Sequence, residues 1–412
     1  MTSEPAAQQR IFDEEFFSDP YKKYAGIHAD GCPVRRVVTP EGVPAWFVSE
    51  HEAVRSGLKD QRLSRRLAHA GPEYRRAPYP TEFLTNSVVT EDPPEHTRLR
   101  RMLNQAFSPR SIGMLRPRIE KLAEELVDDI SARIEREGTA DLVTGLALPL
   151  PITVIAELLG VPPESRADFR RWGDGMLSLV PREQAEAGAA MLAFLTGLVE
   201  EKAARPGDDM LSTWVAARDD DGEPLKPQEV IGLAMVMLVG GYDTSVGMIA
   251  ATLMGLLGDR EKFAELIDDP SLLPEVVEEF LRLYGTVHTG VRRFATEPMS
   301  LGGQEIAAGD TVLLSIAAAD RDPARYPDPD GVDFTRPGNR GHLAFGMGPH
   351  VCPGNELARL EISIAVETVL RRLKGLRLTV APQEIPWRRA YFIRVPLHLP
   401  VTRTVEEGER HD

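Results

Sequence analysis

The sequence is poor in cysteine, in aromatic residues and in positive charge, and each shortage excludes something. Only Cys32 and Cys352 are cysteines among 412 residues, and 6% of the residues are aromatic. Two cysteines cannot build a disulfide framework, and they fit a reducing compartment. Lys and Arg number 48 against 63 Asp and Glu, which gives a net charge of −15. Such a surface disfavours nonspecific nucleic-acid binding, which depends on cations that neutralise phosphates.

Long hydrophobic runs are also missing. No stretch of about 18 uncharged apolar residues occurs, so we expect no membrane span. Residues 1–19 are acidic and polar, and they show no basic start followed by an apolar segment. We therefore expect no secretory signal and a cytoplasmic protein. The composition, 42% hydrophobic and 27% charged, is ordinary for a folded chain.

Helical patterns dominate the chain, and strand-like runs are few. A hairpin is predicted at 33–49 around the turn at 39–42, and short strands are predicted within 291–315. No alternation of strand and helix occurs, so we do not expect a doubly wound sheet. No linker divides the chain, so residues 1–412 are expected to form one domain, mainly α with a minor β part. Helices are predicted at 93–104, 112–137, 149–159, 183–204, 227–257, 274–284 and 353–373.

The strongest local signal surrounds the second cysteine, in Phe345-Gly-Met-Gly-Pro-His-Val-Cys352-Pro-Gly354. The three glycines allow the backbone to come close to a flat object. Pro353 is suited to open the following helix, which would put Cys352 at a helix N-terminus. Free N–H groups there favour a thiolate. A thiolate beside a glycine-lined face is what an axial haem ligand needs.

Three other interpretations of this cysteine were weighed. A lone cysteine is most often a small buried hydrophobe. A zinc site would need further Cys or His at short spacing, and no Cys-x-x-Cys is present. A dinucleotide loop would need a third glycine where Val351 stands.

The predicted helix at 227–257 carries polar residues in an apolar stretch, Gly240-Gly241-Tyr-Asp243-Thr244. In one interpretation the glycines allow close helix packing and Asp243 pairs with a buried cation. In the other, the glycines make room for a ligand and Thr244 perturbs the helix hydrogen bonds. The acid and the alcohol would then deliver protons to dioxygen.

Together these patterns resemble the cytochrome P-450 family of haem-thiolate monooxygenases in its soluble bacterial form. The resemblance runs from about Phe12 to Val401. It implies a helix-rich triangular prism with small β-sheets, haem b with Cys352 as axial ligand, and O2 as co-substrate. It also implies that Gly241 lies beside the haem, that Thr244 hydrogen-bonds dioxygen and that Asp243 controls the proton supply.

The resemblance further implies partners for the haem carboxylates. His96 and Arg100 stand four residues apart, so on a helix they share a face; in isolation such a run is also typical of a solvated basic face. Five side chains are more than two carboxylates need. The implied carboxylate partners are His96, Arg100, Arg293, His342 and His350, and the implied haem contacts in the cysteine loop are Phe345, Gly346 and Gly354.

Other residues are assigned to folding and to the substrate. Glu279 and Arg282 stand at helical spacing and are expected to form an ion network with Arg336, which supports folding rather than chemistry. Arg65, Arg66, Arg75 and Arg76 are suited to an anionic substrate, although solvated loop charge is the favoured interpretation. By resemblance, the substrate contacts are Val236, Val239, Gly240, Thr289, Val291 and Ile393.

The resemblance implies that a ferredoxin and its reductase supply electrons. Candidate docking cations are Arg98, Arg101, Arg110 and Arg359. We predict insertion of one oxygen atom from O2 into a C–H or C=C bond of a small organic molecule, in the tailoring of a natural product. The alternative is a haem-binding recruitment module of a biosynthetic assembly that performs no oxidation, which the intact Asp243 and Thr244 disfavour.

Overall fold

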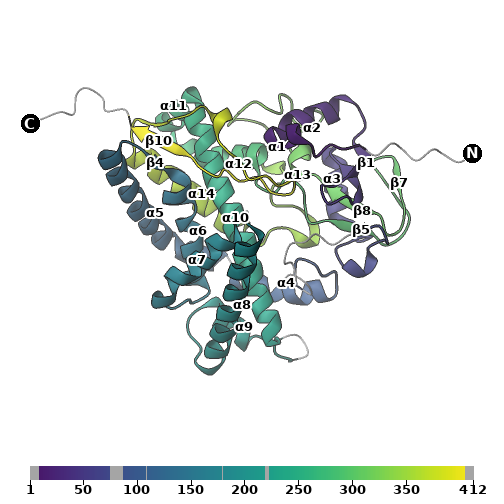
Figure 1. Cartoon of the computed structure of the whole chain (residues 1–412), viewed down its shortest axis with the longest axis horizontal. Coiled ribbons are helices and arrows are strands. Elements are labelled where there is room, and N and C mark those ends of the chain that lie inside the picture. The colour runs from purple at the N-terminus through teal and green to yellow at the C-terminus, as the bar shows by residue number, and fades with distance from the viewer. Residues whose placement is uncertain (1–8, 75–86, 108, 179, 219–221, 404–412) are drawn as a thin grey trace, which may run out of the picture.

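A computed structural model describes residues 9–74, 87–107, 109–178, 180–218 and 222–403. One long helix, α10 (Pro227–Gly258), runs through the middle of the molecule, and the other elements pack around it (Figure 1). Most of its side chains between Val230 and Leu257 are buried. A helix that is apolar on nearly every side requires such a position.

Helices form the larger part of the molecule, to the left of α10 and at the bottom in Figure 1. α10 itself contacts α6, α8, α12 and α14. A proline stands in the first turn of α6, α8, α10 and α12, where its missing N–H costs nothing. The bounds are α4 (Glu95–Ala106), α5 (Pro109–Glu137), α6 (Pro149–Leu158), α7 (Arg166–Met176), α8 (Pro181–Ala204), α9 (Met210–Ala216), α11 (Arg260–Asp268), α12 (Leu273–Tyr284) and α14 (Asn355–Arg372).

A mixed sheet and the N-terminal helices form the other part, on the right in Figure 1. Its strand order is β1-β2-β8-β5-β3, with β2 and β8 parallel and the other pairs antiparallel. Leu63 pairs with Ala295, so the residues that follow β3 lie beside the start of β5. The bounds are α1 (Glu14–Ser18), α2 (Pro20–Ala29), β1 (Val34–Val38), β2 (Pro44–Val48), α3 (His51–Lys59), β3 (Leu63–Ser64), β5 (Arg293–Ala295) and β8 (Thr311–Leu314).

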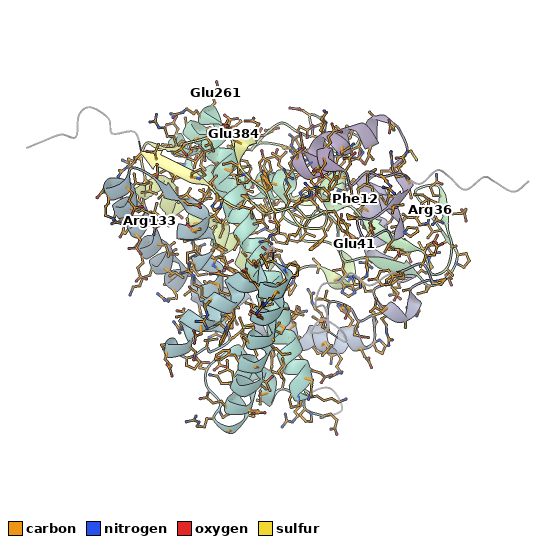
Figure 2. All side chains as sticks on the ribbon, in the orientation of Figure 1. Phe12, Arg36, Glu41, Arg133, Glu261 and Glu384 are labelled. Atoms are coloured by element: carbon orange, nitrogen blue, oxygen red, sulfur yellow. The ribbon has the colours of Figure 1, made fainter. Side chains whose placement is uncertain are left out.

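Aromatic side chains attach the N-terminal helices to this sheet. Phe12, labelled in Figure 2, packs edge-on against Phe16 and Phe47. Tyr391 of the C-terminal segment tilts against the same ring, which joins the two ends of the chain. The remaining elements are α13 (Ile316–Ala319), a hairpin of β6 (Met299–Leu301) and β7 (Gln304–Ile306), and a sheet of β4 (Ala140–Asp141), β10 (Pro400–Arg403) and β9 (Leu376–Leu378).

The predicted fold class, mainly α with a minor β part, is confirmed. All seven predicted helices are present, with ends within three residues of those expected. One difference matters for the site, because α14 begins at Asn355 and not at Pro353. Helix α7 was missed because its sequence RADFRRWGDGM mixes glycine with charge, although Phe169, Trp172 and Met176 stand at helical spacing. Arg75 and Arg76 lie outside the described residues.

Helix α10 is long and apolar enough, by length and composition, to cross a membrane. The most apolar 18-residue segment of α10 is 61% buried inside the molecule, which is typical of a core helix. The apolar surface of α10 is therefore used largely in internal packing.

Candidate active site

The cysteine loop connects the sheet part to α14 and folds tightly on itself. Cys352 donates its N–H to the carbonyl of Phe345 at 2.8 Å, and Asn355 Nδ2 donates to the carbonyl of Cys352 at 2.9 Å. Gly348 has φ of +75°, and a Cβ there would lie 3.0 Å from the carbonyl oxygen of Leu58. Glycine is therefore required where the loop passes α3.

Burial and nearby N–H groups and cations act in opposite directions on the Cys352 thiol. Cys352 precedes the first residue of α14 by three positions, so the helix N-terminus does not dominate its surroundings. Burial raises the pKa of the Cys352 thiol above its usual value, while an N–H of Gly354 and the charges of Arg100 and Arg359 oppose the rise. Burial favours the neutral thiol, whereas the Gly354 N–H acts in the predicted direction and favours the thiolate. The thiolate at Cys352 stays a prediction.

The two adjacent glycines of α10 have different surroundings. A Cβ on Gly241 would lie 3.3 Å from Ile155 Cδ1, so Gly241 serves the packing of α10 against α6. A Cβ on Gly240 would meet nothing within 4 Å, and Gly240 is exposed although its helix is largely buried. Gly240 is the glycine that borders open space, and the cofactor contact of Gly241 stays a prediction.

Thr244 lies one turn beyond Gly240 on the same side of α10. Its hydroxyl donates to the carbonyl of Gly240, a bond that competes with the helix's own ladder. Thr286 Oγ1 in turn donates to the carbonyl of Thr244 at 3.1 Å. These contacts hold a hydroxyl, which is both donor and acceptor, next to the open side of the helix.

Asp243 pairs with a cation that the sequence analysis did not identify. Arg388 Nη1 lies 2.5 Å from Asp243 Oδ2, and the two side chains are 13% and 11% exposed. Burial raises the pKa of Asp243, and Arg388 opposes the rise. Among the described residues, Asp243 Oδ1 has no hydrogen-bond partner. The two interpretations of Asp243 therefore coexist, since it has a buried cation and also an unused oxygen.

Five basic side chains meet beside β3 and β5. They form what we call the cation cluster, Arg65, His96, Arg100, Arg293 and His350. The rings of His96 and His350 are 4.0 Å apart. Burial, followed by the charges of Arg100 and Arg65, lowers the pKa of His96 to about 4. Burial lowers the pKa of Arg293 to about 10.

Four members of the cation cluster are the predicted carboxylate partners His96, Arg100, Arg293 and His350, which the structure brings together. Arg65 was expected to be a solvated loop charge and is instead enclosed with them. Burial and Arg293 lower the pKa of Arg65 well below its usual value. The sequence signal for Arg65 would have been its position directly after a strand that pairs with the strand of Arg293.

His342 is not part of the cation cluster. Its Nε2 lies 3.1 Å from Glu278 Oε2, and its Nδ1 accepts the N–H of Ala344 at 3.2 Å. Arg359 Nε donates to the other oxygen of Glu278 at 2.5 Å. Both ring nitrogens of His342 are thus in use, so its assignment to a haem carboxylate is corrected.

The expected ion network is present and is fully buried. Arg282 donates to both oxygens of Glu279 at 2.8 and 2.9 Å, and Arg336 Nε donates to Glu279 Oε1 at 3.1 Å. The remaining N–H groups of the two arginines reach backbone carbonyls, including those of Asp320 and Gly331. We call Glu279, Arg282 and Arg336 the Glu279 network.

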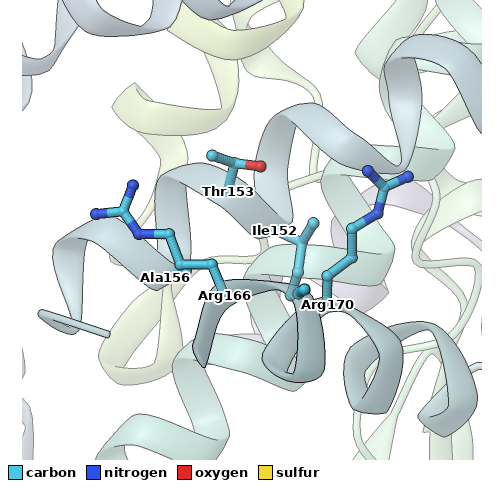
Figure 3. A pocket seen from close by; sticks show the side chains of 6 residues that line it. Ile152, Thr153, Ala156, Arg166 and Arg170 are labelled. Carbon is cyan, nitrogen blue, oxygen red and sulfur yellow. The ribbon is translucent and has the colours of Figure 1, made fainter. Parts of the chain in front are cut away.

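The predicted substrate residues divide into two groups. Val236 and Val239 are half-buried, and Gly240 and Val291 are exposed, so these four have open surface. Thr289 and Ile393 are buried at a junction, where Thr289 Oγ1 donates to the carbonyl of Tyr391 at 3.4 Å and Ile393 pairs with Val287. A separate pocket of about 200 Å³ lies between α6 and α7 and contains none of the motif residues (Figure 3).

These observations fit a flat group that carries carboxylates. The cation cluster holds buried polar atoms without partners in the described part of the chain, Arg65 Nε and His96 Nε2. Gly240 leaves open space on the central helix, and the cysteine loop presents a sulfur. A haem with a cysteine ligand and two propionates has this donor requirement.

Comparison with known proteins agrees with this geometry. The family model described as Cytochrome P450 matches residues 176–389. The chain belongs to the cytochrome P450 family, and it is a P450 monooxygenase, an oxidoreductase. Membership implies a haem with a cysteine thiolate ligand.

Particular relatives span nearly the whole chain. The chain is 41% identical to the cytochrome P450 monooxygenase PikC of Streptomyces venezuelae, over 99% of this chain and 97% of the relative. It is 37% identical to 6-deoxyerythronolide B hydroxylase of Saccharopolyspora erythraea, over 94% and 97%. The solved structure of the P450 PksS of Bacillus subtilis superposes with a TM-score of 0.88 at 30% identity and covers 97% of this chain and 100% of that one.

Proposed function

We propose that this protein inserts one oxygen atom from O2 into a C–H or C=C bond of a small organic substrate and thereby tailors a natural product. The observation that carries the proposal is the Asp243–Thr244 pair on α10, beside the open side of Gly240, in a chain that also has the cysteine loop. Relatives named as 6-deoxyerythronolide B hydroxylase and mycinamicin IV hydroxylase/epoxidase support the substrate class.

The chain's own side chains would hold haem b at two places. Cys352 would bind the iron through its sulfur, and the cation cluster would bind the two propionates. The glycines of the cysteine loop keep the backbone from obstructing a flat ring. When bound, the haem supplies the iron at which O2 is activated. Binding the metal requires the thiolate, so coordination would reverse the burial effect on the Cys352 pKa.

Proton supply is the task proposed for Asp243 and Thr244. Asp243 has one oxygen in its ion pair with Arg388 and one without a described partner, so Oδ1 is the atom that would hold and release a proton. The Thr244 hydroxyl would pass the proton on, because it donates and accepts at the same atom. Half-buried Val236 and Val239, on the same helix, would keep bulk water from the site.

Electrons are proposed to come from a ferredoxin in the cytoplasm. Among the candidate docking cations, Arg98 pairs with Glu229 and Arg359 pairs with Glu278. Arg359 also lies over the ring of Phe345, 4.6 Å from its centre. Arg110 is exposed, so we retain it as a proposed docking cation.

The test begins with a binding screen on the purified holoprotein, using 6-deoxyerythronolide B and mycinamicin IV among other macrolactones. A change in the spin state of the haem iron reports entry of a compound into the pocket. Hits are then incubated with a ferredoxin, its reductase and a reductant, with oxygen uptake and product mass as readouts. The proposal predicts substrate-dependent oxygen uptake and a product heavier by one oxygen atom. Compounds that bind without any oxygen uptake would favour the non-catalytic recruitment module.

A further inference from the structure

Arg65 is the one member of the cation cluster that the family resemblance does not assign. It follows β3 directly, and Arg293 on the neighbouring β5 donates to the carbonyl of Leu63 at 3.0 Å. The strand pairing therefore places the two arginines side by side. Arg293 is buried and Arg65 is half-buried, so solvent screens the repulsion between their guanidinium groups only in part.

The protein satisfies Arg65 only in part. One Nη1 N–H is donated to the carbonyl of Val89 at 3.0 Å, and the backbone N–H is donated to Asp92 Oδ1 at 3.1 Å. Asp92 also accepts from Ser64, so this carboxylate binds the backbone and the hydroxyl rather than the Arg65 guanidinium. Arg65 Nε is buried and has no partner in the described part of the chain.

The cation cluster and its neighbouring carboxylates do not balance in charge. Arg65, Arg100 and Arg293 contribute three positive charges, and Asp92 contributes one negative charge. Asp60, which also acts on Arg293, is neutralised by its own pair with Arg62 at 2.7 Å. With both histidines neutral, as their lowered pKa values favour, the balance is two positive charges without counter-ions. A buried cation needs a hydrogen-bonded anionic partner.

We propose that Arg65 is a further carboxylate-binding residue of the haem site, and that it completes the charge balance against the two propionates. This rests on the proposed haem-binding function. With Arg100 and Arg293 alone, Asp92 would leave one net positive charge against two propionates. With Arg65 the count closes at zero. The Nε and Nη2 groups form the planar fork that binds a carboxylate through two parallel bonds.

The neighbouring Arg66 provides a matched control. Its side chain is 49% exposed and its Nε lies 3.4 Å from Glu91 Oε2, so it has solvent and a counter-ion. Arg66→Gln removes the same charge one residue away from the proposed site. Because water screens the Arg66 charge, we expect Arg66→Gln to leave haem release and the reduction potential unchanged.

The experiment compares holoproteins of the wild type, Arg65→Gln, Arg65→Lys and Arg66→Gln. Haem release is followed by transfer to excess apomyoglobin, and the reduction potential is measured by spectroelectrochemistry. We expect Arg65→Gln to release haem roughly tenfold faster, which corresponds to one lost charge-assisted hydrogen bond. Its potential becomes more negative, because a cation that favours the electron-rich reduced state is gone. Arg65→Lys keeps the charge, so its potential stays near the wild-type value while release is faster, since a lysine lacks the fork.

Wild-type release and wild-type potential in Arg65→Gln would overturn the inference, and so would an equal effect of Arg66→Gln. A change confined to substrate binding would also overturn it, since Arg65 would then serve an anionic substrate. If Arg65→Gln does not accumulate as holoprotein, the haem release of Arg65→Lys tests the inference. Unchanged haem release in Arg65→Lys would contradict a two-bond contact between the Arg65 guanidinium and a carboxylate. These outcomes are separate from failure of the proposed function, which would show as absence of a cysteine-ligated haem in the wild type.

Discussion

The molecule contains two groups of arginines in its interior, one whose hydrogen bonds and charge the protein satisfies and one, partly buried, whose charge it does not. In the Glu279 network, the carboxylate accepts from both Arg282 and Arg336, and backbone carbonyls take the remaining N–H groups. In the cation cluster, Arg65 and Arg293 rely on backbone carbonyls and keep uncompensated charge. Buried charge that the chain satisfies itself supports folding, whereas buried charge left without a counter-ion indicates a ligand.

The largest expected effect on stability comes from removing the carboxylate of the Glu279 network. Glu279→Ala would leave Arg282 and Arg336 buried without a carboxylate, so we expect the free energy of unfolding to fall by about 3–5 kcal/mol. Denaturant unfolding of the holoprotein measures it. The control is Glu275→Gln, which removes a mostly exposed pair with Arg340 and is expected to cost at most about 1 kcal/mol. Equal losses in the two variants would contradict the role of the Glu279 network.

A smaller effect is expected at Asp320, an acid beside the Glu279 network. Its carbonyl accepts from Arg282 and its Oδ1 accepts from the N–H of Leu343 at 2.7 Å. Burial raises the pKa of Asp320 to about 7. A folded-state pKa above the unfolded value means that the stability contributed by Asp320 is full below about pH 4 and is lost as pH rises through about 7.

Asp320→Asn keeps the acceptor for Leu343 and removes the charge. We therefore expect this variant to be more stable than the wild type at pH 8, by about 1–4 kcal/mol, with little difference at pH 4. Thermal unfolding across this pH range measures both values. A wild type that gains stability between pH 5 and 8 relative to the variant would show that the Asp320 carboxylate is compensated.

The Asp243–Arg388 pair is intermediate between the Glu279 network and the cation cluster. Each side chain makes the ion pair and also has one buried atom without a partner among the described residues. Arg388→Met would remove the group that opposes the burial effect, so the pKa of Asp243 would rise further. We expect a loss of about 1–3 kcal/mol at pH 8 and a smaller loss at pH 6, where the acid is more readily neutral. Arg388→Lys should recover part of the stability. An equal loss at both pH values would mean that the effect is packing alone.

The smallest effect on stability is expected at Thr244, where the hydroxyl bond to Gly240 adds little to a helix. Thr244→Ala should change the free energy of unfolding by at most about 1 kcal/mol. It should keep its haem and divert most electrons to peroxide instead of product. The ratio of peroxide to product per electron measures this, and Thr244→Ser, which keeps the hydroxyl, should behave like the wild type. Unchanged coupling in Thr244→Ala would contradict the proton-delivery role.

Local patterns predicted much of this structure. The Cys352 loop, the Asp243–Thr244 pair and the helical spacing of Glu279 and Arg282 are short motifs whose geometry follows from few residues. The long helices followed from apolar periodicity and from prolines at their starts. The fold class and the family follow from these elements together.

Contacts between distant segments could not be predicted in the same way. Arg388 stands 145 residues from Asp243, and Glu278 stands 64 residues from His342. Packing decides which of several arginines or glutamates contacts a given partner. Motif spacing carries no information about that packing. The different surroundings of Gly240 and Gly241 could not be predicted for the same reason, because one step along a helix turns a residue by about 100° toward a different neighbour.

The central claim is that the Cys352 sulfur binds the iron of a haem as a thiolate. The most direct test is the absorption spectrum of the reduced protein with carbon monoxide. We expect the red-shifted Soret band that thiolate ligation produces, and its loss in Cys352→Ala but not in Cys32→Ala. A wild-type protein without this band, or a Cys352→Ala variant that retains it, would contradict the account.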